Sequence, residues 1–568
     1  MPSLADATLE DARGRLFDLL VIGGGINGAG IARDAALRGL SVCLVEKNDW
    51  GWGTSAKSSK LAHGGLRYLE QFEFGLVHEA LQDRERLLRQ APHLVRPLRF
   101  LYPIYPHVAA RRTVRVGLLL YDVLSHGKSV EGRDHHSVEE TLRVAPGLER
   151  EGLKGGATYT DGQIQHVERL VAELVVDAAA HGALCLNHAR VKEILVGPDD
   201  AGTERARGAV VVDGKGREAT VRSRATVNAA GPWVDDVLGR LGAGRPPKVR
   251  KTKGVHVLVP RFLDTAVIVK AASDGRTFFI IPWQEHCIIG TTDTDYTGDP
   301  GDAVAEPEDV AYLLEEARRY FPDAPLDEVR YTYAGVRALV NEEGLTESNV
   351  TRRHILYDHG RKEGLEGLWT LQGGKITTYR SLAEECVDRV ATALGRNDVS
   401  KAHPTREGTL PGGPLIDWET YRAAAVRTAQ ADHGLLPRSA EHLVDTYGAR
   451  WAQVLSSSRE AGAVDGAERV RKGLPHLRAE VDFAVREEGA RTLGDVMLRR
   501  TTMGLARDGA PEVARSVAAR MAGLLGWDRR RLAEERRRYA DEAAMFWIDA
   551  LDPARPLPPA VLGRSVAA

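Results

Sequence analysis

Three glycines and one glutamate near the N-terminus have the types and the spacing that bind a dinucleotide. The glycines form the motif Gly23-x-Gly25-x-x-Gly28, and Glu46 follows at about 20 residues' distance. Gly23 permits a tight turn, Gly25 lets the backbone approach a pyrophosphate, and Gly28 lets a helix pack closely on a strand. The helix N-terminus offers N–H groups to the phosphates, and a carboxylate can accept hydrogen bonds from the ribose hydroxyls.

The surrounding elements occur in the order that this chemistry requires. An apolar segment over residues 17–22 predicts a buried strand, and the alanine-rich segment after the glycines predicts a helix. A second apolar segment over 41–45 predicts another strand, which ends at the acidic residue. Because strand, glycines, helix, strand and carboxylate fall in register, the sequence predicts a Rossmann-type unit that binds a dinucleotide.

Three later segments indicate which dinucleotide is bound. The small, hydroxyl-rich loop over 51–60 suits a backbone that wraps around the ribityl chain and pyrophosphate of a flavin. The apolar segment 224–231 ends in small residues, as expected where a chain passes close to the cofactor. Segment 368–379 predicts a strand, a double glycine and a helix start, whose N–H groups can face the electron-rich end of a reduced flavin. Together the three segments favour FAD over NAD.

Six segments resemble one known family: LLVIGGGINGAGIARDAALRGLSVCLVE, SSKLAHGGLRYLE, NAAGPWVDD, IIGTTDTDY, YAGVRAL and GGKITTYR. They are similar to the FAD-dependent (respiratory, aerobic) glycerol-3-phosphate dehydrogenases, which pass electrons to quinone. The resemblance extends from residue 17 to 502 and takes in DVMLRRTTMG of the family's C-terminal domain. SSKLAHGGLRYLE is the most specific piece, because it combines flavin-loop and active-site residues. Related glycerophosphate oxidases, which use oxygen, share much of this pattern.

The resemblance implies FAD as the cofactor and predicts which residues contact it. They come from the glycine motif, the end of the second strand, the hydroxyl-rich loop with its continuation, and the later small-residue segments. The predicted set is Gly23, Gly25, Asn27, Gly28, Glu46, Thr54, Ser55, Ser58, Ser59, Leu61, His63, Gly64, Gly65, Val191, Ala230, Gly231, Trp233, Gly373, Gly374, Lys375, Ile376 and Thr377. Trp52 departs from the expected pattern, since a smaller residue is expected before the loop.

The resemblance also implies glycerol 3-phosphate as the substrate, and this dianion requires fixed cations. Arginine suits the task because its planar fork grips phosphate oxygens in pairs. Most of the 77 lysines and arginines are expected to be solvated surface charges. By resemblance, the predicted substrate-binding residues are Arg67, Tyr68, Arg337, Arg352 and Lys375.

The expected reaction transfers a hydride from C2 of the alcohol to flavin N5 and releases the hydroxyl proton to a base. Histidine suits the base because its pKa lies near neutrality. His63 in LAHGGLRY is the first candidate, and His256 in KGVHVLVP is the second. Arg337 is expected to stabilise the developing alkoxide, and Lys375 to polarise the same oxygen.

Bulk composition excludes some classes of protein. The 568 residues can form three or four domain-sized units, and the formal net charge of −2 argues against a nucleic-acid partner. Four widely spaced cysteines have neither CxxC nor metal-ligand spacing, and we expect them to be reduced and buried. The polar N-terminus resembles no targeting signal, and no apolar run reaches the roughly 20 residues that span a bilayer. We therefore expect a cytoplasmic protein without a metal.

The predicted fold class is α/β (α+β overall), with a Rossmann-type FAD-binding domain, an inserted antiparallel-sheet substrate domain and a C-terminal all-helical domain. The FAD-binding domain is expected over 15–85, 151–247 and 355–405, interrupted by an insertion over 86–150. Aromatic and β-branched runs predict the substrate domain over 248–354. Alanine, arginine and glutamate with helical periodicity predict the helical domain over 406–568, which is expected to cover the active site or to mediate dimer contacts.

The electron acceptor admits more than one interpretation. A respiratory enzyme would take quinone from the inner face of the cytoplasmic membrane, and Arg111, Arg112 and Arg115 beside the apolar segment 116–124 could meet anionic headgroups there. The alternative is that this segment belongs to the core. The basic segment 528–538 is better explained as an exposed helix with internal salt bridges. A glycerophosphate oxidase, an amine or amino-acid-type oxidase, and a non-catalytic flavoprotein remain alternatives.

Overall fold

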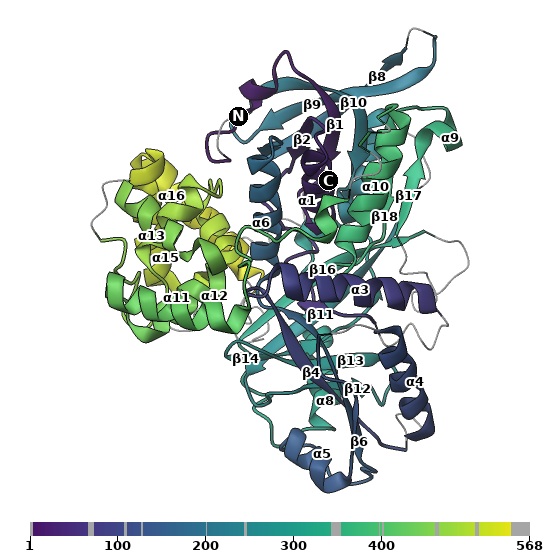
Figure 1. The fold of residues 1–568 in the computed structure, drawn as a ribbon, viewed down its shortest axis with the longest axis vertical. Coiled ribbons are helices and arrows are strands. Elements are labelled where there is room, and N and C mark those ends of the chain that lie inside the picture. Colours follow the sequence, from purple (N-terminus) through teal and green to yellow (C-terminus); the bar gives the residue numbers. More distant parts are fainter. Residues whose placement is uncertain are drawn as a thin grey trace.

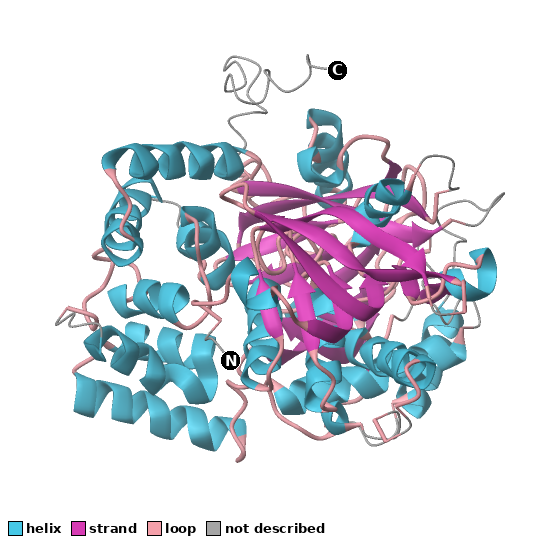
Figure 2. Cartoon of the chain, turned by 90° about the horizontal axis from the view of Figure 1, so that it is seen from above, coloured by secondary structure: helices cyan, strands magenta, loops and turns pink. Residues whose placement is uncertain are grey.

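The structure, a computed structural model, describes residues 4–65, 73–106, 111–125, 129–199, 201–242, 247–341, 354–396, 398–399, 403–460, 465–505 and 510–546. Two sheets lie one above the other in Figure 1, and a group of C-terminal helices lies to one side of them. Figure 2 gives the same separation from above, with the strands gathered apart from the C-terminal helices. The predicted mixed fold class is confirmed.

The first sheet has a parallel centre because its strands are linked through helices. Within the described residues, its strand order is β17 (Ile355–Asp358), β18 (Leu368–Gln372), β10 (Glu218–Asn228), β1 (Leu16–Ile22), β2 (Val42–Val45) and β7 (Leu184–Leu186). Strand β1 pairs in parallel with both β2 and β10, so that their carboxyl ends share one edge of the sheet. The antiparallel β8 (Ala189–Pro198) and β9 (Glu204–Asp213) extend from β10.

Three helices cover this sheet and bury its apolar side chains. Helix α1 (Ile26–Leu37) contacts both α6 (Val167–Ala180) and α10 (Tyr379–Ala393). Their apolar residues share one core with the side chains of β1 and β2. The strand residues before the glycine motif are buried, as the apolar segment predicted, so that the turn after β1 is held by packing on its strand and its helix.

The second sheet, as far as the structure describes it, is antiparallel except for one parallel pair, β4 with β12. Its order is β15 (Thr294–Asp295), β11 (Val249–Pro260), β14 (His286–Gly290), β13 (Thr277–Trp283), β12 (Ala266–Lys270), β4 (Val95–Pro103), β6 (Gly156–Ile164) and β3 (Leu61–Ala62), with β16 (Tyr331–Val340) on β11 and β5 (Asp134–His136) on β6. The domain boundaries predicted from sequence assigned β4 to the insertion and β6 to the FAD-binding domain. Both strands instead pair in the substrate sheet.

Further helices link the segments, and they divide between the two sheets. These are α3 (Phe74–Gln90), α4 (Arg111–Leu124), α5 (Val138–Val144), α7 (Val234–Leu238), α8 (Pro307–Arg318) and α9 (His359–Glu363). Helix α4 includes the predicted apolar segment and has two different faces. Leu118 and Tyr121 are buried in the core of the second sheet, whereas Leu119, Leu120 and Val123 are 45%, 38% and 64% exposed. The side chains of the three arginines at its start lie outside the described residues.

The C-terminal region has two apolar cores of its own. Its helices are α11 (Trp418–His433), α12 (Pro437–Tyr447), α13 (Trp451–Glu460), α14 (Arg478–Arg486), a π-helical segment (Asp495–Arg500), α15 (Ala510–Leu525) and α16 (Arg529–Ala544). Salt bridges at i,i+4 spacing on α16, from Arg530 to Glu534 and from Arg531 to Glu535, confirm the predicted salt-bridged helix. No helix within the described residues is long and apolar enough to cross a membrane. All four cysteines are free and buried, as predicted.

Candidate functional site

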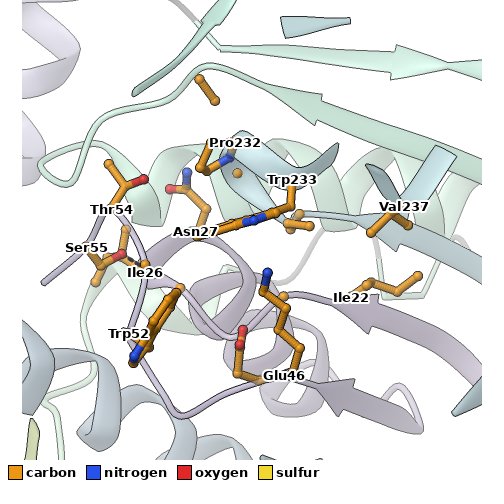
Figure 3. Close-up of a pocket in the computed structure, with 18 of the residues that line it drawn as sticks. Ile22, Ile26, Asn27, Glu46, Trp52, Thr54, Ser55, Pro232, Trp233 and Val237 are labelled. Carbon is orange, nitrogen blue, oxygen red and sulfur yellow. Dashed lines mark hydrogen bonds between the residues drawn. The ribbon is translucent and has the colours of Figure 1, made fainter. Parts of the chain in front are cut away.

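A cavity of about 640 Å³ opens where the carboxyl ends of β1, β2 and β10 meet (Figure 3). It continues from the Rossmann turn to β16 and to the segment between β18 and α10. Many residues of the predicted cofactor set line it: Gly23, Gly25, Asn27, Glu46, Thr54, Ser55, Ser58, Val191, Ala230, Gly231, Trp233, Gly373, Gly374, Lys375 and Ile376. Its elongated lining suits a dinucleotide that runs from one sheet to the other.

Two glycines fix the backbone at the phosphate end of the cavity. Gly23 has a φ of 108°, and a Cβ there would lie 2.6 Å from the carbonyl oxygen of Ala229. A Cβ on Gly28 would lie only 1.9 Å from the carbonyl oxygen of Gly23. Gly28 therefore contributes helix–strand packing and not a cavity wall, in agreement with the sequence interpretation. Helix α1 begins at Ile26, so its N-terminus and dipole face the cavity.

Glu46 ends β2 at the position where a ribose hydroxyl can be bound. Its carboxylate accepts hydrogen bonds from the backbone N–H groups of Gly24 and Asn48, each at 2.7 Å. Burial raises the pKa of Glu46 above its ordinary value, and the two N–H groups offset part of this rise. Since an ionised carboxylate has about four acceptor positions, it can hold its own turn and still accept from a ribose.

The hydroxyl-rich loop divides between the cavity and the protein interior. Thr54 donates to the carbonyl oxygen of Val336 at 2.6 Å, and the Ser55 hydroxyl accepts from the N–H of Ile26 at 3.0 Å. Ser59 does not line the cavity, and its Oγ lies 2.8 Å from Nε2 of His256. The other predicted cofactor residues that do not line the cavity are Leu61, His63, Gly64, Gly65 and Thr377. Leu61 instead begins β3 and pairs with Gln163 of the second sheet.

Aromatic side chains form one wall of the cavity, and only one of them was in the predicted set. The rings of Trp52 and Trp233 lie 5.9 Å apart, and the Lys47 ammonium lies 3.9 Å from the centre of the Trp233 ring. Trp233 donates from its indole N–H to Asp299 at 3.1 Å. The bulky residue that departed from the expected loop pattern is therefore part of the cavity wall (Figure 3). Composition alone offered no signal for this role of Trp52.

The end of the cavity nearest the second sheet carries one of the predicted cations. Arg337 on β16 donates to Asp293 and to the Thr291 hydroxyl, both at 2.9 Å. Its guanidinium lies over Gly254 of the neighbouring strand β11, where a Cβ would approach Nη2 to 2.2 Å. Lys375 lines the same cavity from the turn after β18, a strand of the first sheet. The fold thus brings two cations to one cofactor cavity, and one of them is held by a carboxylate.

The two candidate bases have different surroundings. The Thr377 hydroxyl accepts a hydrogen bond from the backbone N–H of His63 at 3.0 Å. Burial lowers the pKa of His63, and the Asp161 carboxylate partly offsets this. His256 is stacked on Tyr333, and burial together with the charges of Arg337 and Lys60 lowers its pKa to about 3.

The two histidines differ accordingly in basicity. A side chain with a pKa near 3 accepts a proton poorly at neutral pH, so the surroundings argue against His256 as the base.

A buried hydrogen-bond chain holds the backbone after His63. The N–H of Gly64 donates to the hydroxyl of Tyr121 on α4 at 3.0 Å, and this hydroxyl donates to Asp161 at 2.5 Å. Arg84 donates to the same carboxylate at 2.9 Å. Sequence reasoning missed these residues, because α3, α4 and β6 supply one each. Predicted substrate contacts Arg67, Tyr68 and Arg352 lie outside the described residues.

Comparisons with known proteins agree with the cavity. The family described as FAD dependent oxidoreductase matches residues 18–380, and the C-terminal domain of alpha-glycerophosphate oxidase matches 403–532. A glycerol-3-phosphate dehydrogenase of Synechocystis is 41% identical over 86% of this chain and 89% of its own. A D-erythritol 1-phosphate dehydrogenase of Brucella abortus is 37% identical over 85% and 94%.

A solved structure extends this similarity to three dimensions. The glycerol-3-phosphate dehydrogenase of Bacillus halodurans, complexed with FAD, superimposes with a TM-score of 0.77 at 30% identity, over 94% of this chain and 96% of that one. The glycine turn, Glu46 and the aromatic wall form a cavity with the donors and acceptors that FAD requires, and FAD is the cofactor. The chain belongs to the FAD-dependent glycerol-3-phosphate dehydrogenase family.

Proposed function

We propose that the protein oxidises sn-glycerol 3-phosphate to dihydroxyacetone phosphate and passes the electrons to a quinone. The observation that carries the proposal is that two cations, Arg337 and Lys375, line the FAD cavity. A phosphorylated polyol is a small dianion, and a guanidinium held by Asp293 and Thr291 meets it without having to reorganise. Relatives whose names specify glycerol-3-phosphate dehydrogenase support the same substrate.

The chemistry divides between the cofactor and the protein. FAD, when bound, accepts the hydride that leaves C2 of the substrate. His63 accepts the proton of the C2 hydroxyl, so that one hydride and one proton leave the alcohol and a ketone remains. Lys375 polarises the reacting oxygen, and Arg337 stabilises the negative charge that develops on it or holds the phosphate. The backbone of the base is held by Thr377, and its neighbour Gly64 by Tyr121.

For the acceptor, helix α4 supports contact with a membrane surface. The side chains of Leu119, Leu120 and Val123 form one exposed apolar strip, whereas their neighbours Leu118 and Tyr121 anchor the helix in the core. An exposed apolar strip on a helix whose sequence begins with several arginines suits the boundary of an anionic bilayer. We infer that the protein binds there peripherally and receives quinone from the lipid, on the inner face of the cytoplasmic membrane.

A second substrate has a specific observation in its favour. The relative named D-erythritol 1-phosphate dehydrogenase is 37% identical to this chain, only slightly less than the 41% identity of the glycerol-3-phosphate dehydrogenase of Synechocystis. Both names specify a phosphorylated polyol, so the same two cations suit either substrate. Because the longer substrate adds one CHOH group, the two candidates differ in length and not in charge.

Steady-state turnover tests both parts of the proposal. The holoenzyme would be assayed with glycerol 3-phosphate, erythritol 1-phosphate and unphosphorylated glycerol, with a quinone in anionic vesicles or with oxygen as acceptor. We expect glycerol 3-phosphate to give the highest kcat/KM, glycerol to give almost none, and quinone to outpace oxygen. A preference for erythritol 1-phosphate would identify that compound as the substrate in place of glycerol 3-phosphate. Stoichiometric peroxide with slow quinone reduction would identify the protein as an oxidase.

A further inference from the structure

The C-terminal domain reaches into the FAD-binding domain through the π-helical segment Asp495–Arg500. Arg500 is fully buried and donates two hydrogen bonds to the Asp49 carboxylate, at 2.6 and 2.9 Å. Arg499 donates to the same carboxylate at 2.9 Å and to Asp495 at 2.9 Å. Paired and hydrogen-bonded charges of this kind are costly to break in the interior, because each lost partner leaves a buried charge. The segment is therefore fixed to the loop that follows β2.

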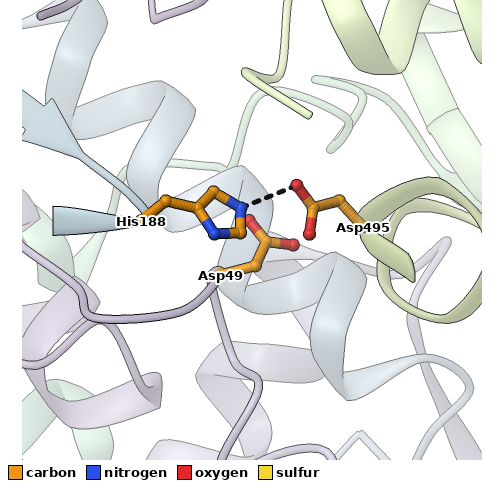
Figure 4. A group of neighbouring side chains, drawn as sticks. All are labelled: Asp49, His188 and Asp495. Atoms are coloured by element: carbon orange, nitrogen blue, oxygen red, sulfur yellow. Dashed lines mark hydrogen bonds and ion pairs between the residues drawn. The ribbon is translucent and has the colours of Figure 1, made fainter. Parts of the chain in front are cut away.

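The same segment also holds the start of β8. Nε2 of His188 lies 2.9 Å from the Asp495 carboxylate, as Figure 4 shows, and the backbone N–H of His188 donates to the carbonyl oxygen of Asn48 at 2.6 Å. Asn187 adds a bridge, since its amide donates to Asp49 and to the carbonyl oxygen of Gly489. The three side chains in Figure 4 have the types of metal ligands, but the arginines already occupy both carboxylates. We interpret the cluster as a salt-bridged joint.

Both segments held by this joint end at the adenosine half of the FAD cavity. Asp49 lies three residues after Glu46, which is placed to bind the ribose, and His188 directly precedes the cavity residues Ala189 and Val191. Lateral movement of either segment would therefore change the ribose and adenine walls. The flavin end of the cavity is built from β16 and the turn after β18.

A second connection runs through the aromatic wall. Trp52 donates from its indole N–H to Glu542 of α16 at 3.0 Å, and Arg499 donates to the same carboxylate at 2.5 Å. The Trp52 ring in turn lines the cavity beside Trp233. Arg499 therefore holds Asp49 directly and, through Glu542, the aromatic wall. Two routes from the C-terminal domain converge on one half of the cofactor site.

We propose that the C-terminal domain clamps the adenosine half of FAD, with Arg499, Arg500 and Glu542 as positioning residues for the loop 46–53 and the start of β8. The clamp acts on the protein walls and not on the reacting atoms. It depends on FAD binding alone and is independent of which polyol phosphate or acceptor is used, so failure of the proposed function would leave it standing.

The test measures how fast FAD leaves the holoenzyme. Release of FAD from the purified wild type and from Arg500→Met, Arg500→Lys and Trp52→Phe would be followed by the rise in free-flavin fluorescence after dilution. Arg500→Met should release FAD at least about tenfold faster, because four hydrogen bonds are lost, two to the Asp49 carboxylate and two to the carbonyl oxygen of Glu488. Arg500→Lys, which keeps the charge, should recover part of this loss, and Trp52→Phe should release FAD about threefold faster.

The control is Arg520→Met, which removes ion pairs to Asp465 and Asp482 that lie wholly within the C-terminal domain. It should lower the thermal unfolding midpoint and leave FAD release within twofold of wild type. ADP, which represents the adenosine half, would also be titrated against FAD rebinding. Arg500→Met should weaken ADP binding by about the same factor as FAD binding.

Three outcomes would overturn the clamp. FAD release within twofold of wild type in Arg500→Met would mean that the joint does not act on the cofactor. Equal acceleration by Arg520→Met would assign the effect to general destabilisation of the C-terminal domain. Unchanged ADP binding alongside weakened FAD binding would move the effect to the flavin end.

Discussion

Substitution of Gly254 by alanine tests the position of Arg337 without removing any charged group. The new Cβ would lie 2.2 Å from Nη2 and 2.6 Å from Cζ of the guanidinium. Contacts of about 3.5 Å are required, so the guanidinium must move by about 1 Å or more, away from Asp293 and Thr291. Misplacement of a catalytic group by about 1 Å costs about 100-fold, or about 2.7 kcal/mol of transition-state stabilisation.

The fold itself should tolerate the same change. The atoms that the Cβ meets belong to the far end of a flexible side chain, and Gly254 has no left-handed φ. We therefore expect the free energy of unfolding to change by about 1 kcal/mol or less. The assay is kcat/KM for glycerol 3-phosphate, measured together with FAD content and the thermal midpoint. Gly523→Ala on α15, where a Cβ meets nothing within 4 Å, is the matched control.

Two results would refute this reasoning. A Gly254→Ala enzyme that keeps kcat/KM within twofold of wild type would show that the position of Arg337 is not critical to turnover. A variant that loses its fold or its FAD in proportion to activity would show that Gly254 serves packing, and the effect on Arg337 would then be secondary.

Three further predictions concern other parts of the molecule. Tyr121→Phe removes the acceptor of the Gly64 N–H. In stopped-flow flavin reduction it should lower kcat about fivefold and leave KM within twofold. An unchanged kcat would refute the role of this hydrogen bond. Burial and nearby His442 lower the pKa of His476 to about 3 in the folded protein. The unfolded chain takes up this proton near pH 6.5, so the free energy of unfolding should fall as the pH drops from about 6.5 towards 3. By pH 5 this amounts to about 2 kcal/mol, and His476→Gln should flatten the measured unfolding curve by that amount; an equally steep curve would contradict it. The double variant Leu119→Ser/Val123→Ser should bind anionic vesicles about tenfold more weakly in sedimentation, while flavin reduction in solution stays unchanged. Unaltered vesicle binding would exclude α4 as the membrane contact.

Local patterns in the sequence predicted the Rossmann unit well. The strand before Gly23, the helix after Gly25 and the strand before Glu46 each have a period and a boundary residue that can be recognised within a few positions. The double glycine at 373–374 likewise marks the turn between β18 and α10. Steric demands of this kind are local, so they can be recognised from the residues close to them in the sequence.

Contacts between distant segments left no such trace. Strands β4 and β6 pair across about 60 residues, and nothing in either segment specifies its partner. Trp52 looked unsuited to the loop because its partners, Trp233 and Glu542, come from segments far away in the sequence. The motif DVMLRR could be associated with the C-terminal domain, but its contact with Asp49 depends on the way two domains pack.

The central claim is that glycerol 3-phosphate delivers a hydride from C2 directly to the bound FAD. Its most direct test is anaerobic stopped-flow reduction of the holoenzyme, with substrate carrying either hydrogen or deuterium at C2. We expect both substrates to bleach the flavin absorbance, and deuterium to slow this bleaching several-fold. Absence of bleaching by either substrate would contradict the claim, because the two cations that line the cavity would then serve a different anion.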